Sequence, residues 1–255
     1  MFPSTQPMDM ADSTADSTAD NMADSTADNM ADSMADSQPR PTAHTALSSL
    51  NPSLLQDLQR FDAASPQREL LEVLAACVRH TQALAITVSA PGQAPLVLSV
   101  FPTERQVHCA QPLADVLDGD LTALQVLEVQ PARWRTPGST EAHRIDQPAH
   151  YAPLGPLLWA VALRGARGAL LPELAGQAAY RLSPGISLGA LVVPGAMAAS
   201  ITRLRRHTCN LREIASWQGV GPQRAMRLLN ALYLQSGLIV SRTHPAATND
   251  GWTGY

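Results

Sequence analysis

Apolar and polar positions alternate most regularly near the C-terminal end, between residues 210 and 242. Apolar residues recur there at helical spacing in two runs, at 211–215 and at 225–232, and each run predicts an amphipathic helix. The run Leu-Ile-Val at 238–240 then predicts a short strand. The hydrophobic pattern alone therefore predicts a helix, a second helix and a strand in succession.

The residues between these runs fit the ends of the predicted helices. Asn210 and Glu213 have the spacing of a capping box, which satisfies free N–H groups at the start of a helix. Gly219 suits the left-handed conformation that ends a helix, and Pro222 suits the first position of the next one. Two helices joined by a short glycine-containing turn and followed by a strand are typical of a winged helix-turn-helix. An ordinary helical hairpin at the end of a domain is the alternative.

The second predicted helix has a face opposite its apolar stripe, and we expect this face to be exposed. It carries Gln223, Arg227, Asn230 and Leu234, with Met226 on its flank. Glutamine and asparagine bind adenine and arginine binds guanine, which favours DNA reading. Leucine and methionine instead suit an apolar groove of a protein, and the short chain after the strand leaves little material for a wing. We therefore predict a protein interface made of Met226, Arg227, Asn230 and Leu234, with DNA reading as the alternative.

Basic residues are concentrated in the same part of the chain. The sequence contains no lysine, so all 18 basic residues are arginines. Residues 197–255 hold seven arginines against two acids, Glu213 and Asp250, which leaves a net charge of +5. Such a segment is typical of phosphate binding, but it also fits a solvated surface. For the DNA alternative, the predicted contacts are Arg203, Arg205, Arg206, Arg212, Gln223, Arg224, Arg227, Asn230 and Arg242.

Before residue 130 the pattern changes to helices followed by short β-type runs. Two predicted helices begin near Pro52 and Pro66. Pro91-Gly92 supplies a hairpin turn between the first two strand-like runs that follow. The elements predicted after the two helices are strands at 84–89, 96–101 and 106–109, a helix at 112–117 and a strand at 121–129. We predict a small α+β domain with an antiparallel sheet.

A resemblance to a known family covers residues 69–112, which read ELLEVLAACVRHTQALAITVSAPGQAPLVLSVFPTERQVHCAQP. This stretch resembles the PATAN domain of bacterial signalling proteins in its leading helix, in a hairpin whose second strand ends at Phe101, and in the strand Val107-His108-Cys109 before another helix. Arg105 stands where that family usually has a glycine. The resemblance implies a regulatory adaptor with a response-regulator receiver domain or a small GTPase as its partner.

The first 46 residues differ in composition from the rest of the chain. From Ala11 to Ser37 an Ala-Asp pair recurs every four residues, a spacing that would place like charges next to each other in a helix. Residues 1–46 hold eight aspartates against Arg40 alone, which gives a net charge of −7. We predict a disordered acidic tail, with a specific docking arm as the alternative.

A hydrolase site is the only catalytic pattern that the sequence offers, and we expect none. Residues 185–189 match the G-x-S-x-G elbow, and Ser187, Glu213 and His244 have the chain order of a triad. However, Pro184 precedes the elbow where a strand is required, and the capping box accounts for Glu213. We therefore predict no catalytic residue and a protein that is not an enzyme.

Membrane, metal and cofactor sites find no support either. No apolar run approaches the ~20 residues of a membrane helix. Cys77, Cys109 and Cys209 are far apart and lack zinc-ligand spacing. We predict no metal, no cofactor, no membrane contact and a cytoplasmic location.

These observations divide the chain and define a preferred function. The predicted parts are a disordered tail at 1–46, a PATAN-like α+β domain at 47–135, a loop at 136–153, a connecting α/β part at 154–194, a winged helix-turn-helix at 195–245 and a tail at 246–255. The preferred function is a non-enzymatic bacterial adaptor in signal transduction that acts through protein–protein contacts. The alternative is a DNA-binding transcriptional regulator that uses the arginine-rich winged helix.

Overall fold

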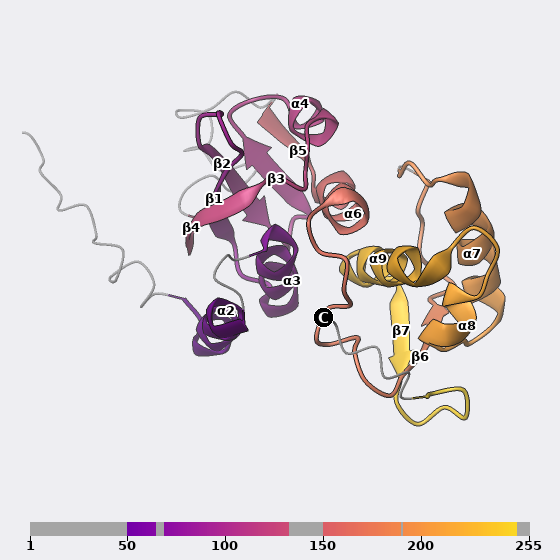
Figure 1. Cartoon of the computed structure of the whole chain (residues 1–255). Coiled ribbons are helices and arrows are strands. Elements are labelled where there is room, and N and C mark those ends of the chain that lie inside the picture. Colours follow the sequence, from indigo (N-terminus) through magenta and orange to yellow (C-terminus); the bar gives the residue numbers. More distant parts are fainter. Residues whose placement is uncertain (1–49, 65–68, 133–149, 190, 249–255) are drawn as a thin grey trace, which may run out of the picture. The chain divides into compact units, whose positions relative to one another are not determined.

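The computed structural model describes residues 50–64, 69–132, 150–189 and 191–248 (Figure 1). All of these residues belong to one compact unit, residues 41–255. The predicted acidic tail at 1–46 lies outside the described residues. Among the helices of the described part, none is long and apolar enough to cross a membrane.

A five-stranded antiparallel sheet confirms the predicted α+β class. Its strands are β1 (Leu84–Ser89), β2 (Leu96–Phe101), β3 (Gln106–Cys109), β4 (Gln125–Pro131) and β5 (Tyr151–Pro153). They lie in the order β4-β1-β2-β3-β5, and every neighbouring pair is antiparallel. The β1–β2 hairpin turns at the predicted position, where Gly92 has a φ of 76°.

β5 lies within residues 136–153, which the sequence pattern predicts as a loop. A strand of three residues that ends in proline is too short to show the alternation typical of a strand. It forms along the edge of β3, where His108 pairs with Tyr151 and Gln106 pairs with Pro153. β5 continues directly into α6 (Leu154–Arg164), so its pairing fixes the start of that helix next to the sheet.

One face of the sheet packs against the interior of the molecule. The alternation along β1 directs Leu84, Ile86 and Val88 into the interior, where each is 0% exposed. The helices α2 (Pro52–Ala64), α3 (Leu70–His80), α4 (Leu113–Asp118) and α6 contribute apolar side chains to the same core. The sheet and these helices therefore share one hydrophobic interior with the helices that follow.

Three helices and a small two-stranded sheet make up the rest of the described chain. The elements are β6 (Ala179–Leu182), α7 (Gly195–Arg206), α8 (Leu211–Ala215), α9 (Gly221–Leu234) and β7 (Leu238–Ser241). The predicted capping box is confirmed, because the Asn210 side chain accepts a bond from the Glu213 N–H at 2.8 Å and the Glu213 carboxylate accepts one from the Asn210 N–H at 3.0 Å. α8 ends at Ala215, and Gly219, which was expected to end it, has the expected left-handed conformation four residues later, with a φ of 75°.

β7 is paired, but its partner strand comes from an unexpected part of the chain. It pairs with β6, which precedes α7, α8 and α9 in sequence. Tyr180 of β6 also forms a bridge with Cys209, between α7 and α8. After β7, a single bridge joins Thr248 to Ala178, and no further strand occurs in the chain up to residue 248.

Candidate functional site

The side of α9 that the sequence pattern predicts as exposed is largely buried. Asn230 and Leu234 are 0% exposed, and Met226 and Arg227 are half-buried. The reason is that α9 packs against α6 as well as against α8 (Figure 1). The apolar stripe of α9 predicts only one of these two helix–helix contacts, because polar side chains of α9 form part of the second one. The expectation that Asn230 and Leu234 face outward is therefore wrong.

Asn230 binds backbone groups of a segment that lacks regular secondary structure. Its Oδ1 accepts a hydrogen bond from the Leu171 N–H, and its Nδ2 donates one to the Ala169 carbonyl, both at 2.9 Å. These groups lie in residues 165–178, the connecting segment between α6 and β6. Buried backbone groups need hydrogen-bond partners, and the side-chain amide provides them here. The amide that was expected to read a base is thus used inside the chain.

Arg227 is also occupied by backbone carbonyls. Its Nη1 donates to the carbonyls of Leu163 at 2.9 Å and Gly165 at 2.8 Å. Both carbonyls lie at the C-terminal end of α6, where a positive charge is favourable because of the helix dipole. Arg227 therefore joins α9 to α6.

Arg242 has a similar role just after β7. Its guanidinium donates to the carbonyls of Glu173 and Ala175 at 2.6 Å and of Gln177 at 2.9 Å. All three acceptors belong to the connecting segment. This arginine of the predicted DNA-contact set is therefore also engaged within the chain.

The other predicted DNA contacts lie on α7, α8 and the start of α9. Arg205 is half-buried and donates to the Ile186 carbonyl at 3.0 Å, and the exposed Arg203 lies 4.8 Å from the ring centroid of Trp217, a cation–π contact. Four further members of the set are exposed: Arg206, Arg212, Gln223 and Arg224. Within the set, Asn230 is buried, Arg205 and Arg227 are half-buried, and the other six residues are exposed, Arg242 among them.

Ion pairs that the sequence pattern does not predict attach the connecting segment to α3. Arg167 contacts Glu69 at 2.7 Å and Glu72 at 2.6 Å, and Glu173 contacts Arg79 at 2.7 Å. Glu72 is 6% exposed, and its burial raises the pKa of its carboxyl while the Arg167 guanidinium opposes that rise. Partners 95 and 98 positions apart leave no local spacing signal. The connecting segment is therefore held by α3 on one side and by α9 on the other.

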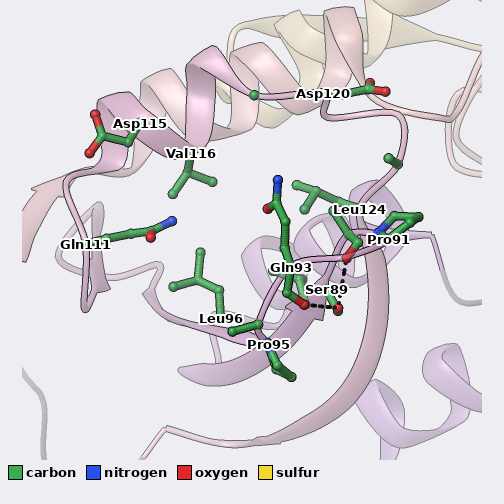
Figure 2. A pocket seen from close by; sticks show the side chains of 15 residues that line it. Ser89, Pro91, Gln93, Pro95, Leu96, Gln111, Asp115, Val116, Asp120 and Leu124 are labelled. Atoms are coloured by element: carbon green, nitrogen blue, oxygen red, sulfur yellow. Dashed lines mark hydrogen bonds between the residues drawn. The ribbon is translucent and has the colours of Figure 1, made fainter.

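A hollow of about 510 Å³ lies between the β1–β2 hairpin and α4 (Figure 2). Leu96 and Val116 line it with apolar groups, and Gln93 reaches into it from the hairpin. The hydroxyl of Ser89 donates to the Gln93 carbonyl at 3.4 Å, so it stabilises the hairpin. Asp115 and Asp120 add carboxylates, and no arginine or histidine lines the hollow among the described residues. This lining disfavours an anionic ligand.

A more apolar groove, which we call the α4–α6 groove, opens on another side of α4. It is bounded by α4, α6 and the start of α7, together with the residues just before α7, and has a volume of about 570 Å³. Its lining includes Leu117, Trp159, Leu163, Val192 and Met197. The sequence pattern does not reveal this groove, because its walls come from three separate parts of the chain.

Comparison with protein-family models, with curated proteins and with solved structures found no match for this chain. Its function is therefore inferred from its own surfaces. The α4–α6 groove and the exposed arginines of α7 and α8 are the two candidate binding surfaces of the described part.

Proposed function

We propose that the protein is a non-enzymatic bacterial adaptor in signal transduction, which acts in the cytoplasm through protein–protein contacts. One observation carries this proposal. Two of the three side chains of α9 suited to read bases, Arg227 and Asn230, bind groups inside the chain, whereas an apolar groove remains open at the surface. Exposed apolar grooves are typical of protein docking.

The sheet-containing part supports a PATAN-like adaptor. The elements α3, β1, β2, β3 and α4 follow one another in the order that the resemblance implies. Arg105, where the family usually has a glycine, has a φ of 56°. This left-handed conformation is the one that favours glycine, so the backbone agrees with the resemblance although the residue differs. A receiver domain or a small GTPase is accordingly the proposed partner.

The C-terminal helices support a winged-helix-like module of unusual connectivity. The elements α7, α8, α9 and β7 have the expected succession of helices and strand. The strand beside β7 is β6, which comes before the helices and not after β7. We propose this module as the second part of the adaptor.

DNA binding is the alternative, and the arginines that remain exposed favour it. Arg203, Arg206, Arg212 and Arg224 are exposed, and Glu213 is the only acidic residue between positions 195 and 248. Such a surface would contact phosphates without reading bases from α9. The affinity for DNA would then depend steeply on salt and weakly on sequence.

Binding of the full-length chain to a mixed-sequence DNA duplex, measured at low and high salt, separates the two functions. Phosphate contacts would give a dissociation constant of about 10⁻⁴–10⁻⁶ M at physiological salt and much tighter binding at low salt, whereas for an adaptor we expect no salt-dependent binding. The double variant Arg206→Ala/Arg212→Ala removes exposed charges, and Arg181→Ala, an exposed arginine of β6, is the matched control. Salt-dependent binding that the double variant abolishes and the control retains would replace the adaptor proposal with the DNA-binding one.

A further inference from the structure

A shallow surface pocket, which we call the Arg203 pocket, lies between the end of α7 and the residues of α8 and its following turn. Its volume is about 550 Å³. The lining includes Arg203, His207, Glu213, Ser216, Trp217 and Gln218. None of these residues lines the α4–α6 groove or the hollow beside the β1–β2 hairpin. The pocket is therefore a separate surface, and it contains one of the exposed arginines of α7.

Trp217 positions the Arg203 guanidinium. The guanidinium carbon lies 4.8 Å from the centroid of the Trp217 ring, and Trp217 itself is half-buried. In the described part of the chain, no hydrogen bond or ion pair engages this guanidinium. An arginine stacked on an aromatic ring keeps its N–H groups available for an acceptor, and its planar fork is already ordered. Arg203 therefore presents a positioned set of donors to the pocket.

The chain around this pocket is strongly basic. Between positions 195 and 248 it has seven arginines and a single acidic residue, Glu213. Arg206 is exposed three positions after Arg203, a spacing that places the two side chains next to each other on α7. The Arg206 guanidinium also has no hydrogen bond or ion pair with any described residue. Two adjacent guanidinium groups without acceptors select an anionic partner by charge complementarity.

Glu213 restricts the class of anion. Its carboxylate lines the same pocket and accepts a hydrogen bond from the Asn210 N–H at 3.0 Å. A DNA duplex carries one negative charge per about 1.7 Å of its axis, so phosphates that reach Arg203 bring further negative charge toward Glu213. A protein segment carries separate carboxylates, and it can place one at Arg203 and a neutral side chain at Glu213. The charges of the pocket therefore favour an acidic protein segment over a phosphate backbone.

We propose that the Arg203 pocket, together with Arg206, binds an acidic segment of a partner protein, with one carboxylate of that segment on the Arg203 guanidinium. This inference rests on the proposed adaptor function, and it specifies the surface and the chemistry of the partner.

Fluorescence anisotropy of labelled synthetic peptides with the full-length chain tests the inference. One peptide carries glutamate at every third position with serine between, and a second has every glutamate replaced by glutamine. We expect the glutamate peptide to bind at least about tenfold more tightly at low salt, as for the gain of a charged hydrogen bond. The difference should decrease as added salt screens the charges. Equal binding of the two peptides, or no binding of either, would overturn the proposal.

Substitutions of Arg203 locate the site. Arg203→Gln removes the charge, and Arg181→Gln, at an exposed arginine of β6, is the matched control. We expect Arg203→Gln to weaken the glutamate peptide at least about tenfold and the control to change its affinity by less than about twofold. Arg203→Lys keeps the charge but lacks the planar fork, so it should restore only part of the affinity. Unchanged binding by Arg203→Gln, or a control that behaves like it, would refute the location.

Glu213→Gln tests why the pocket favours a protein segment over DNA. Glutamine can still accept the Asn210 N–H bond of the capping box, while the negative charge is removed. We expect this variant to strengthen low-salt binding of a mixed-sequence duplex more than binding of the glutamate peptide. An equal gain for both ligands, or no gain for the duplex, would refute the selection of a protein partner by Glu213.

The outcomes also separate this inference from the proposed function. Binding of a purified receiver domain or GTPase that Arg203→Gln leaves unchanged would retain the adaptor function but refute the pocket as its site. Salt-dependent binding of the wild-type chain to the duplex, abolished in Arg203→Gln, would assign the pocket to nucleic acid and refute both the inference and the adaptor function.

Discussion

Nη2 of Arg105 donates a hydrogen bond of 3.1 Å to Oε1 of Gln235, which lies 130 positions later in the chain. Arg105 stands just before β3, and Gln235 is the residue that follows α9. Nε2 of Gln235 in turn donates to the carbonyl of Gly155 in α6 at 2.9 Å. Burial lowers the pKa of the Arg105 guanidinium. The sheet, α6 and α9 therefore meet at this pair of side chains.

Substitutions of Arg105 separate its hydrogen bonds from its backbone strain. Arg105→Ala removes the bonds but keeps a side chain in the left-handed conformation, at a φ of 56°. We expect it to lower the free energy of unfolding by about 2 kcal/mol, as for the loss of a charged hydrogen bond. Arg105→Gly removes the same bonds and relieves the strain, so its loss is smaller by about 1 kcal/mol. Urea denaturation measures both values.

Gln235→Ala provides the control for this pair. If Arg105 acts through Gln235, the double variant Arg105→Ala/Gln235→Ala loses less stability than the sum of the two single variants. Losses that add fully would show that the two side chains act independently.

The elements that sequence predicted well are those defined by local signals. The Asn210–Glu213 capping box depends on residues three positions apart, and the β1–β2 hairpin depends on the turn at Gly92; both are present. β5 was not predicted, because its three residues are too few to show the alternation of a strand and the strand forms through its pairing with β3.

The candidate site was predicted less well, because long-range packing defines it. An apolar stripe distinguishes the inside of a helix from the outside only when the inner side is apolar. α9 contacts α6 and the connecting segment through Arg227 and Asn230, so a buried side appears polar in the sequence.

Asn230→Leu tests the internal role of this asparagine. The substitution keeps a side chain of similar size but leaves the Leu171 N–H and the Ala169 carbonyl without the partners they have in the native chain. Each unpaired buried group costs about 1–3 kcal/mol, so we expect the free energy of unfolding to fall by about 2–4 kcal/mol. Gln223→Leu, at an exposed position of the same helix, should change it by less than about 0.5 kcal/mol. Unchanged stability of Asn230→Leu in chemical denaturation would contradict the role assigned here.

Glu72 makes stability depend on pH in a direction that its burial fixes. Its pKa is raised in the folded chain, so the folded state binds the proton more tightly than the unfolded state does. The contribution of Glu72 to stability is therefore greatest at low pH and decreases as pH rises through the raised pKa. Arg167, Glu69 and Glu173 also shift the pKa of this carboxyl. The pH dependence due to Glu72 is therefore measured as a difference in stability between the wild-type chain and a variant.

Glu72→Gln isolates this effect. We expect the stability of the wild-type chain relative to Glu72→Gln to fall as pH rises from the acidic range, when unfolding is followed by circular dichroism at a series of pH values. Glu104→Gln, at an exposed position, is the matched control. A wild-type advantage that grows with pH would show that the bond to Arg167 outweighs burial.

Arg227→Ala and Arg206→Ala should differ in their effect on the free energy of unfolding, although both residues belong to the predicted DNA-contact set. Arg227 binds two carbonyls at the end of α6, so its loss should lower the free energy of unfolding by about 2 kcal/mol and leave DNA binding unchanged. Arg206 is exposed on α7, so its loss should change stability by less than about 0.5 kcal/mol. Thermal denaturation and a duplex-binding titration of each variant measure the two effects. If Arg227→Ala is as stable as the wild-type chain but binds DNA more weakly, the internal role of Arg227 is wrong and base reading by α9 is supported.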